Sequence, residues 1–293
     1  MTVHSVPERD LGQAYAHCQA VCRAYDKDRY AAALFAPAER RPHLFALYAF
    51  NAEISRVRET VSDPLPGEMR FQWWRDLLKG GVEREPDGNP VAAALLATMH
   101  DNLLPIDPFL QLIEARTFDL YDDPMPAWLD LEGYCGETSS ALIRLSAIIL
   151  AKGGDMGCAD CCGHAGVAFA LTGILRAFPW HSARGQVYVP DEHLKAHGAG
   201  RDDIVHGRAT PQVLTALAGA RERVREHMTE TRLRIAKIPG HLAPAFLPVC
   251  LVDPCLKAME APGYDPFRTA VSISPVTRLW RMWSQSRCAA RAG

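Results

Sequence analysis

Apolar residues recur every three or four positions along almost the whole chain, and clusters of proline and glycine interrupt this pattern. Leu142, Leu145 and Ile149 illustrate the spacing, which places apolar side chains on one face of a helix. Alternating strand patterns bounded by hairpin turns are almost absent, and the best candidate, residues 186–189, is short. The chain is therefore expected to be all-α.

The proline and glycine clusters divide the chain into separate helices. We expect helices at residues 8–24, 37–60, 68–79, 90–100, 107–120, 128–151, 156–177, 190–196, 211–238 and 246–259. No composition shift, flexible linker or internal repeat separates two halves of the sequence. One domain over residues 1–293 is the simplest prediction.

Composition excludes several classes of protein. Hydrophobic residues make up 48% and charged residues 23%, which is ordinary for a globular chain, and the net charge of -2 provides no basic field for nucleic acid. Residues 1–10 lack the apolar core of a secretory signal. The sequence also contains no run of about 18 apolar residues, so we expect no membrane-spanning helix. We expect a cytoplasmic location.

Two polar clusters each leave two interpretations open. Cys158, Cys161, Cys162 and His164 have part of the spacing of a zinc site, but buried thiols at a helix start are favoured because a second ligand pair is not evident.

The arginines of the helix at 211–238 alternate with glutamates. A solvated helix face with i,i+3 and i,i+4 ion pairs is therefore favoured over a phosphate-binding surface.

Several sequence blocks resemble those of squalene/phytoene synthases and occur in the order found in that family. The blocks are Leu47-Tyr48-Ala49-Phe50, Arg70-Phe71-Gln72-Trp73-Trp74-Arg75-Asp76, Leu112-Ile113-Glu114 with Phe118-Asp119-Leu120, Tyr134-Cys135 with Thr138-Ser139-Ser140, and residues 166–190. The resemblance implies an all-α isoprenoid-synthase-type bundle around a central cavity, where two prenyl diphosphates are joined head to head. In such enzymes two aspartate-rich motifs hold Mg²⁺, a cation that prefers carboxylate and phosphate oxygens and supports departure of the diphosphate.

The metal-binding positions implied by the resemblance have lost most of their carboxylates. Ser55 and Glu59 occupy the first motif, and Ala177 and His181 occupy the closing motif. Pro179 is expected to end the preceding helix near Ala177. Glu59 alone remains as a candidate Mg²⁺ ligand, so we assign no catalytic residue and expect no cofactor.

The same departures make the chain similar to a branch of the family that contains the mitochondrial complex I assembly factor. This resemblance includes Phe50-Asn51-Ala52-Glu53 and the segment 173–190. It implies a non-catalytic protein that binds a lipid or a protein partner during assembly of a respiratory complex. The alternative is an active squalene or phytoene synthase type of prenyltransferase with a rearranged Mg²⁺ site.

The family fold also implies a set of ligand-binding residues. Aromatic faces suit an isoprenoid chain, and arginines suit an anionic head group. Core packing and internal ion pairs explain the same residue types. The candidates are Tyr48, Glu53, Arg70, Trp74, Tyr134, Arg176 and Arg184.

The C-terminal segment 276–291 combines tryptophan and leucine with arginine and contains no acidic residue. This composition suits an amphipathic helix on an anionic membrane, and hence a peripheral position on the inner face. The alternative is a final helix whose tryptophans dock against the protein while its arginines face water.

Overall fold

The computed structural model describes residues 8–80 and 88–292, of which none forms a strand, and 74% of the structure is helical. The all-α prediction is therefore confirmed. The segment at 186–189, the best strand candidate of the sequence, forms no strand. Two predictions fall partly outside the described residues. They are the polar N-terminal segment, at residues 1–7, and the proline- and glycine-containing segment before the helix predicted at 90–100, at residues 85–87.

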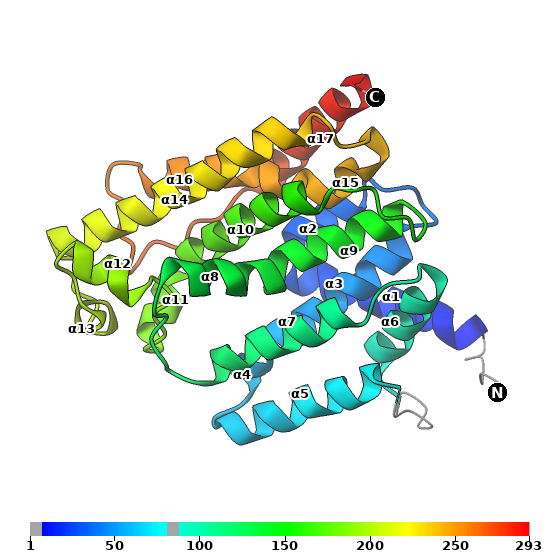
Figure 1. Ribbon diagram of the computed structural model, residues 1–293, viewed down its shortest axis with the longest axis horizontal. Coiled ribbons are helices and arrows are strands. Elements are labelled where there is room, and N and C mark those ends of the chain that lie inside the picture. Colours follow the sequence, from blue (N-terminus) through cyan, green and yellow to red (C-terminus); the bar gives the residue numbers. More distant parts are fainter. Residues whose placement is uncertain (1–7, 81–87, 293) are drawn as a thin grey trace. The chain divides into compact units, whose positions relative to one another are not determined.

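The helices group into two compact units, which are described separately (Figure 1). Unit 1 contains residues 1–120, 144–157 and 241–245, and unit 2 contains residues 121–143, 158–240 and 246–293. The single-domain arrangement and the central cavity stay predictions.

Unit 1 is built mainly from the first third of the chain. Its elements are α1 (Glu8–Tyr25), α2 (Lys27–Ala33), α3 (Arg41–Ser55), α4 (Val57–Thr60), α5 (Pro64–Leu78), α6 (Pro90–Asp101), α7 (Asp107–Thr117) and the 3₁₀ turn η1 (Phe118–Leu120). Helix α9 (Ala141–Leu150) contributes its residues from Arg144 onward.

Helix α3 forms the core of unit 1. Every residue from Leu44 to Ala52 is buried, so the helix is enclosed on all sides rather than along one stripe. It packs against α1 and α6, which also pack against each other.

Unit 2 contains the longer helices of the second half. Its elements are α8 (Trp128–Cys135), the π-helix η2 (Gly136–Ser140), α10 (Ala159–Arg176), α11 (Phe178–Ala183), α12 (Asp191–Ala196), α13 (Arg201–Val205), α14 (Pro211–Ile235), the 3₁₀ turn η4 (Leu247–Leu251), α16 (Val252–Met259) and α17 (Pro275–Ala292). The 3₁₀ turn η3 (Gly240–Leu242) and α15 (Ala243–Phe246) are divided between the units: residues 241–245 belong to unit 1, and Gly240 and Phe246 belong to unit 2.

Helix α10 is the centre of unit 2, where it packs against α14, η2, α8, α16 and η4. A Cβ atom added at Gly166 would lie 2.3 Å from the Cα of Ser140 in η2. The backbones of α10 and η2 therefore meet without an intervening side chain. The hydroxyl of Ser140 donates a hydrogen bond of 2.8 Å to the carbonyl of Gly163 at the same contact.

The predicted ion pairs on the arginine-rich helix are present in α14. Arg225 bonds Glu222, and Arg234 bonds Glu230. Further acids from α16, its flanking residue Glu260 and α10 also pair with arginines of α14. The interpretation as a solvated, charge-balanced helix face is confirmed.

The segment Gly240–Met259 is long and apolar enough to span a membrane, with a mean hydropathy of 1.5. Its window is 67% buried within the protein, and the chain there is divided among η3, α15, η4 and α16. Both properties are those of a core segment of a folded protein.

We predict that Gly166→Ala destabilises the protein by about 2 kcal/mol or more, because overpacking costs about 1–3 kcal/mol and the neighbouring atoms belong to backbone. Gly173→Ala on the same helix is the control, since its added methyl group meets nothing within 4 Å. It should stabilise α10 by up to about 1 kcal/mol. Urea unfolding of both variants measures the difference, and equal stability of the two would contradict the close contact.

Candidate functional site

The helix that carries the first motif is interrupted. Helix α3 ends at Ser55, and α4 begins only at Val57. Between them, the guanidinium of Arg56 lies 3.5 Å from the centroid of the Tyr25 ring. The predicted continuous helix at 37–60 is therefore wrong at this point: Arg56, with φ −96° and ψ −1°, caps the end of α3 and the start of α4.

Glu59, the single remaining carboxylate of that motif, faces a cation. Its Oε2 lies 3.6 Å from Nε of Arg56, and its side chain is about half exposed. The hydroxyl of Ser55 donates to the carbonyl of Ala52 at 3.3 Å. A hydroxyl used within its own helix and a carboxylate beside a guanidinium do not fit a Mg²⁺–diphosphate site.

The closing motif is divided between two helices. Helix α10 ends at Arg176 with Ala177 as its cap, and Pro179 lies in the first turn of α11, where its missing amide is tolerated. The predicted helix end near Ala177 is confirmed. The side chain of Ala177 has no atom that could bind a metal, and the ring of His181 lies 4.7 Å from that of Tyr188. In residues 8–80 and 88–292, no three His, Cys, Asp or Glu side chains gather as metal ligands.

Two of the ligand-binding candidates in unit 1 are core residues. The hydroxyl of Tyr48 is 2.9 Å from that of Ser146, and burial raises the pKa of Tyr48 to about 12. The ring of Trp74 makes an edge contact with Phe50 at 5.0 Å between centroids. Both side chains are buried, which matches the core-packing alternative.

The two charged candidates in unit 1 interact with each other. Burial raises the pKa of the Glu53 carboxyl, while a hydrogen bond to Asn89 and the charges of His17 and Arg70 act in the opposite direction. Arg70 is exposed and donates to the hydroxyl of Thr60 at 2.7 Å. The charge of Arg70 thus favours the ionised form of Glu53 against the effect of burial.

The candidates in unit 2 include part of an aromatic group. Tyr134 lies 5.8 Å from Tyr188 between ring centroids, and Tyr188 also contacts His181. Nε of Arg176 donates to the carbonyl of Val271 at 3.2 Å. Arg184 is exposed just after α11. The structure thus brings Tyr134 and His181 to a shared neighbour, Tyr188.

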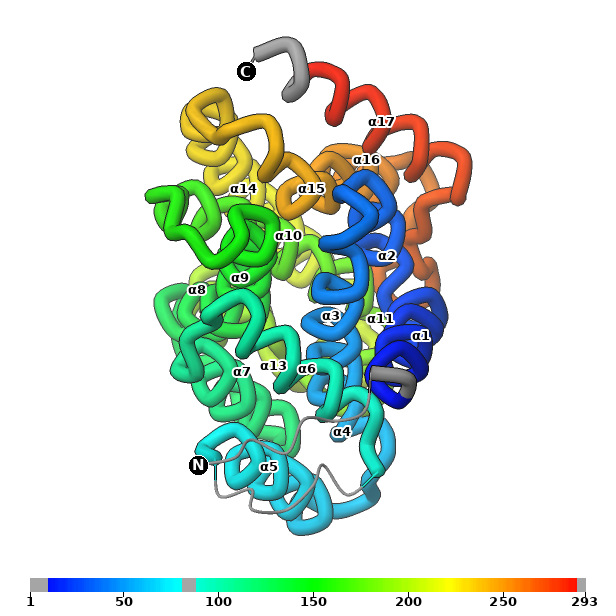
Figure 2. The backbone as a smooth tube through the Cα atoms, turned by 90° about the vertical axis from the view of Figure 1, so that its right-hand side faces the viewer, coloured from blue at the N-terminus to red at the C-terminus, as the bar shows by residue number. Residues whose placement is uncertain are grey.

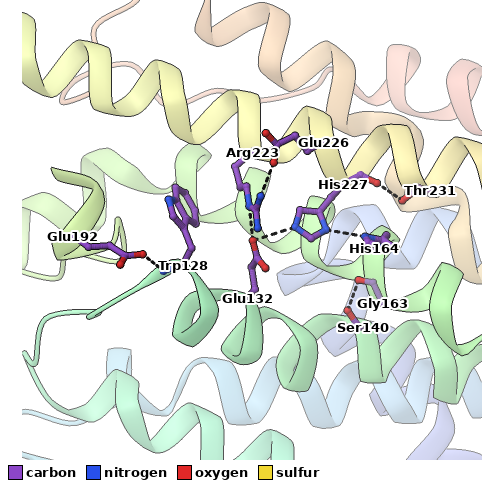
Figure 3. Close-up of polar contacts among 10 residues, drawn as sticks. All are labelled: Trp128, Glu132, Ser140, Gly163, His164, Glu192, Arg223, Glu226, His227 and Thr231. Carbon is purple, nitrogen blue, oxygen red and sulfur yellow. Dashed lines mark hydrogen bonds and ion pairs between the residues drawn. The ribbon is translucent and has the colours of Figure 1, made fainter. Parts of the chain in front are cut away.

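Unit 2 also contains a polar cluster that the sequence did not reveal (Figure 3). The carboxylate of Glu132 on α8 accepts from Nε of Arg223 at 2.6 Å and from Nε2 of His227 at 3.2 Å, both on α14. Nδ1 of His227 lies 3.1 Å from Nδ1 of His164 on α10. The cluster therefore connects three helices of unit 2 through a chain of hydrogen bonds.

An ionised carboxylate can only accept hydrogen bonds, so Glu132 requires its partners Arg223 and His227 to be the donors. Burial raises the pKa of Glu132, but the hydrogen bonds from Arg223 and His227 outweigh it and hold this pKa below its usual range. When His227 is neutral and donates through Nε2 to the carboxylate, its Nδ1 accepts from His164; when His227 is protonated, its charge opposes protonation of His164. Burial and then the charges of His227 and Arg234 lower the pKa of His164, although Asp160 and Glu230 act in the opposite direction.

His164 is thus paired with His227 rather than with the nearby cysteines. Cys158, Cys161 and Cys162 are buried at the start of α10, with 3.6 Å between the sulfur atoms of Cys158 and Cys162. The interpretation as buried thiols at a helix start is confirmed.

The sequence provided little signal for the cluster. His227 lies among arginines and glutamates on α14, and Glu132 lies on α8, far away along the chain. His164 has a sequence signal of its own, its spacing from the cysteines, but that spacing suggests a zinc site rather than this cluster. The partnership depends on how three helices pack.

Comparison with known proteins decides the family. The family model described as squalene/phytoene synthase matches residues 22–281 of the chain. The chain belongs to the squalene/phytoene synthase family.

Members and relatives of this family resemble the chain over most of its length. It is 27% identical over 278 residues to the rat protein named NADH dehydrogenase (ubiquinone) complex I, assembly factor 6, covering 92% of this chain and 83% of the relative. It is 25% identical to the chloroplastic phytoene synthase of carrot (Daucus carota), covering 92% and 69% respectively.

A solved structure has the same fold. The crystal structure of squalene synthase HpnC from Alicyclobacillus acidocaldarius is 26% identical and superposes with a TM-score of 0.76 over 89% of this chain and 98% of that one. The predicted isoprenoid-synthase helical fold is confirmed, and so is the similarity of this squalene/phytoene synthase family member to the complex I assembly factor.

The lowered pKa of His164 predicts a pH-dependent stability. The unfolded chain takes up this proton more readily than the folded one, so stability should fall as the pH drops through about 6.5, the ordinary histidine value. His164→Gln should reduce that slope, by no more than about 1.4 kcal/mol per pH unit for one proton.

Urea unfolding between neutral pH and the ordinary histidine range measures this slope. His100→Gln is the control, because the side chain of His100 is 86% exposed and lies beside its chain neighbour Asp101. An unchanged slope in His164→Gln would contradict the lowered pKa that the part-buried pairing of His164 with His227 produces.

Proposed function

We propose that this chain is a non-catalytic member of the squalene/phytoene synthase family that binds a lipid or a protein partner during assembly of a respiratory complex. One observation carries the proposal: the motif positions hold Ser55, Glu59, Ala177 and His181, and the only carboxylate among them faces Arg56. Such a donor set cannot neutralise a departing diphosphate as an aspartate-rich site does.

The similarity to complex I assembly factor 6 supports the assembly role, since that relative covers most of the chain. For location, we propose the cytoplasm with a peripheral position on the inner face of the membrane, because respiratory complex I is a membrane complex. No cofactor is part of the proposal. The alternative, an active prenyltransferase with a rearranged Mg²⁺ site, draws on the similarity to phytoene synthase and squalene synthase.

The ligand-binding residues are part of this proposal. In unit 2, Tyr134 with Tyr188 and His181 presents aromatic faces suited to an unsaturated chain, and Arg176 and Arg184 supply cationic groups. In unit 1, Arg70 and Glu53 are the polar candidates, and Tyr48 and Trp74 are the buried aromatic ones. Native mass spectrometry of the purified protein should detect a co-purifying lipid.

An activity assay separates the two functions. Purified protein with farnesyl or geranylgeranyl diphosphate and Mg²⁺ should form no more squalene-type or phytoene-type product than a reaction without protein. Product that disappears in Glu59→Ala, but persists in the exposed control Glu39→Ala, would establish the prenyltransferase instead.

A genetic experiment tests the assembly role itself. Deletion of the gene in the source organism should lower the amount of assembled respiratory complex I, measured on native gels. Glu59→Ala should restore the amount fully, since the proposal gives this carboxylate no metal to hold. Normal complex I in the deletion strain would refute the role.

A further inference from the structure

Helix α17 docks on the protein through one face. Met282 is fully buried and Arg278 is almost so, and these residues are one helical turn apart. The helix packs against η4, and both elements belong to unit 2 (Figure 2). The orientation of α17 about its own axis is therefore determined by the structure.

The opposite face of α17 carries large apolar side chains that are exposed. Val276 is 78% exposed, Leu279 47%, Trp280 60% and Trp283 49%. Their spacing of i, i+3, i+4 and i+7 aligns them along one side of the helix, and we call these four residues the exposed stripe. A contiguous apolar surface of this kind marks an interaction site.

The charge around the exposed stripe selects its partner. Between Pro275 and Ala292 the sequence has arginines at 278, 281, 287 and 291 and no acidic residue. The guanidinium of Arg287 lies 5.1 Å from the centroid of the Trp283 ring, at the end of the stripe. The side chain of Arg291 lies outside the described residues.

Helix α14 provides the contrast within the same unit. It is equally rich in arginine, but Arg223, Arg225 and Arg234 are bonded to glutamate or aspartate. Helix α17 has no acid of its own, and the exposed Arg287 at the end of the stripe gives this surface a cation that complements an anionic one.

We propose that α17 binds the surface of a membrane that contains anionic lipids. The exposed stripe enters the boundary between head groups and acyl chains, where indole rings are favoured, while Arg287 meets the lipid phosphates. Arg278 and Met282 keep the helix attached to the protein. The inference deepens the peripheral location proposed above and rests on it for the choice of a membrane, but does not depend on a role in complex I assembly.

Vesicle flotation with the full-length purified protein tests the proposal. The protein should float with vesicles of phosphatidylcholine mixed with phosphatidylglycerol, and much less with phosphatidylcholine alone. High salt should weaken the binding, because it screens charges separated by more than about 3 Å at 1 M. Flotation that is absent, or equal with both kinds of vesicle, would overturn the proposal.

Paired variants locate the binding surface. Trp280→Ser with Trp283→Ser should reduce binding roughly tenfold or more, since both indoles leave the interface. Arg287→Gln should weaken binding to the anionic vesicles only. Trp180→Ser is the matched control, because this tryptophan of α11 is 54% exposed but lies away from α17 in the sequence, and it should bind like the wild type.

Thermal unfolding of each variant shows that the fold is intact, as expected for substitutions at exposed positions. Size-exclusion chromatography with light scattering tests the rival occupant, a second copy of the chain. A dimer that the paired tryptophan substitutions convert to monomer, in a protein that does not float, would overturn the membrane proposal. Neither outcome bears on the deletion experiment, so failure of this inference is distinguishable from failure of the assembly role.

Discussion

The contact between α10 and η2 is the constraint on which unit 2 depends. Gly166 allows the backbone of α10 to meet Ser140 directly, and no side chain larger than hydrogen fits there. Two residues earlier, His164 turns toward α14 and forms the hydrogen-bonded chain to Glu132. Just past the C-terminal end of α10, Pro179 lies in the first turn of a new helix, α11. The same helix thus joins the packing centre, the polar cluster and the altered closing motif.

The altered motifs have lost carboxylates, and a helix boundary lies within or beside each of them. Two carboxylates four residues apart share a face only if the helix is continuous between them. Arg56 interrupts the helix between Ser55 and Glu59, and Pro179 follows the end of α10 at the closing motif. At the closing motif the amide of His181 still donates to the carbonyl of Ala177 at 3.0 Å, so one helical turn joins the two positions and what is lost there is the carboxylates themselves.

The polar cluster and α17 show two uses of arginine in one unit. On α14 the guanidiniums are bonded to acids from four elements or flanking segments, which stabilises the packing of helices. On α17 the chain supplies arginine without acid, beside exposed tryptophan. Arginines of α14 are thus bonded to acids within the protein, whereas α17 has no acid of its own and carries the exposed Arg287 beside its apolar stripe.

The sequence by itself determined the helical class, most helix positions, the family and the loss of motif carboxylates, because these depend on local spacing and on residue identity. It also predicted the end of α10 near Ala177, since proline acts on its own helix. Only the tertiary structure decided that Arg56 breaks α3, that Tyr48 and Trp74 are buried in the core, and that Glu132 reaches His227. It also decided which face of α17 is docked and which is exposed. These outcomes depend on contacts between segments distant in the chain, and helical periodicity carries no information about which distant face a side chain will meet.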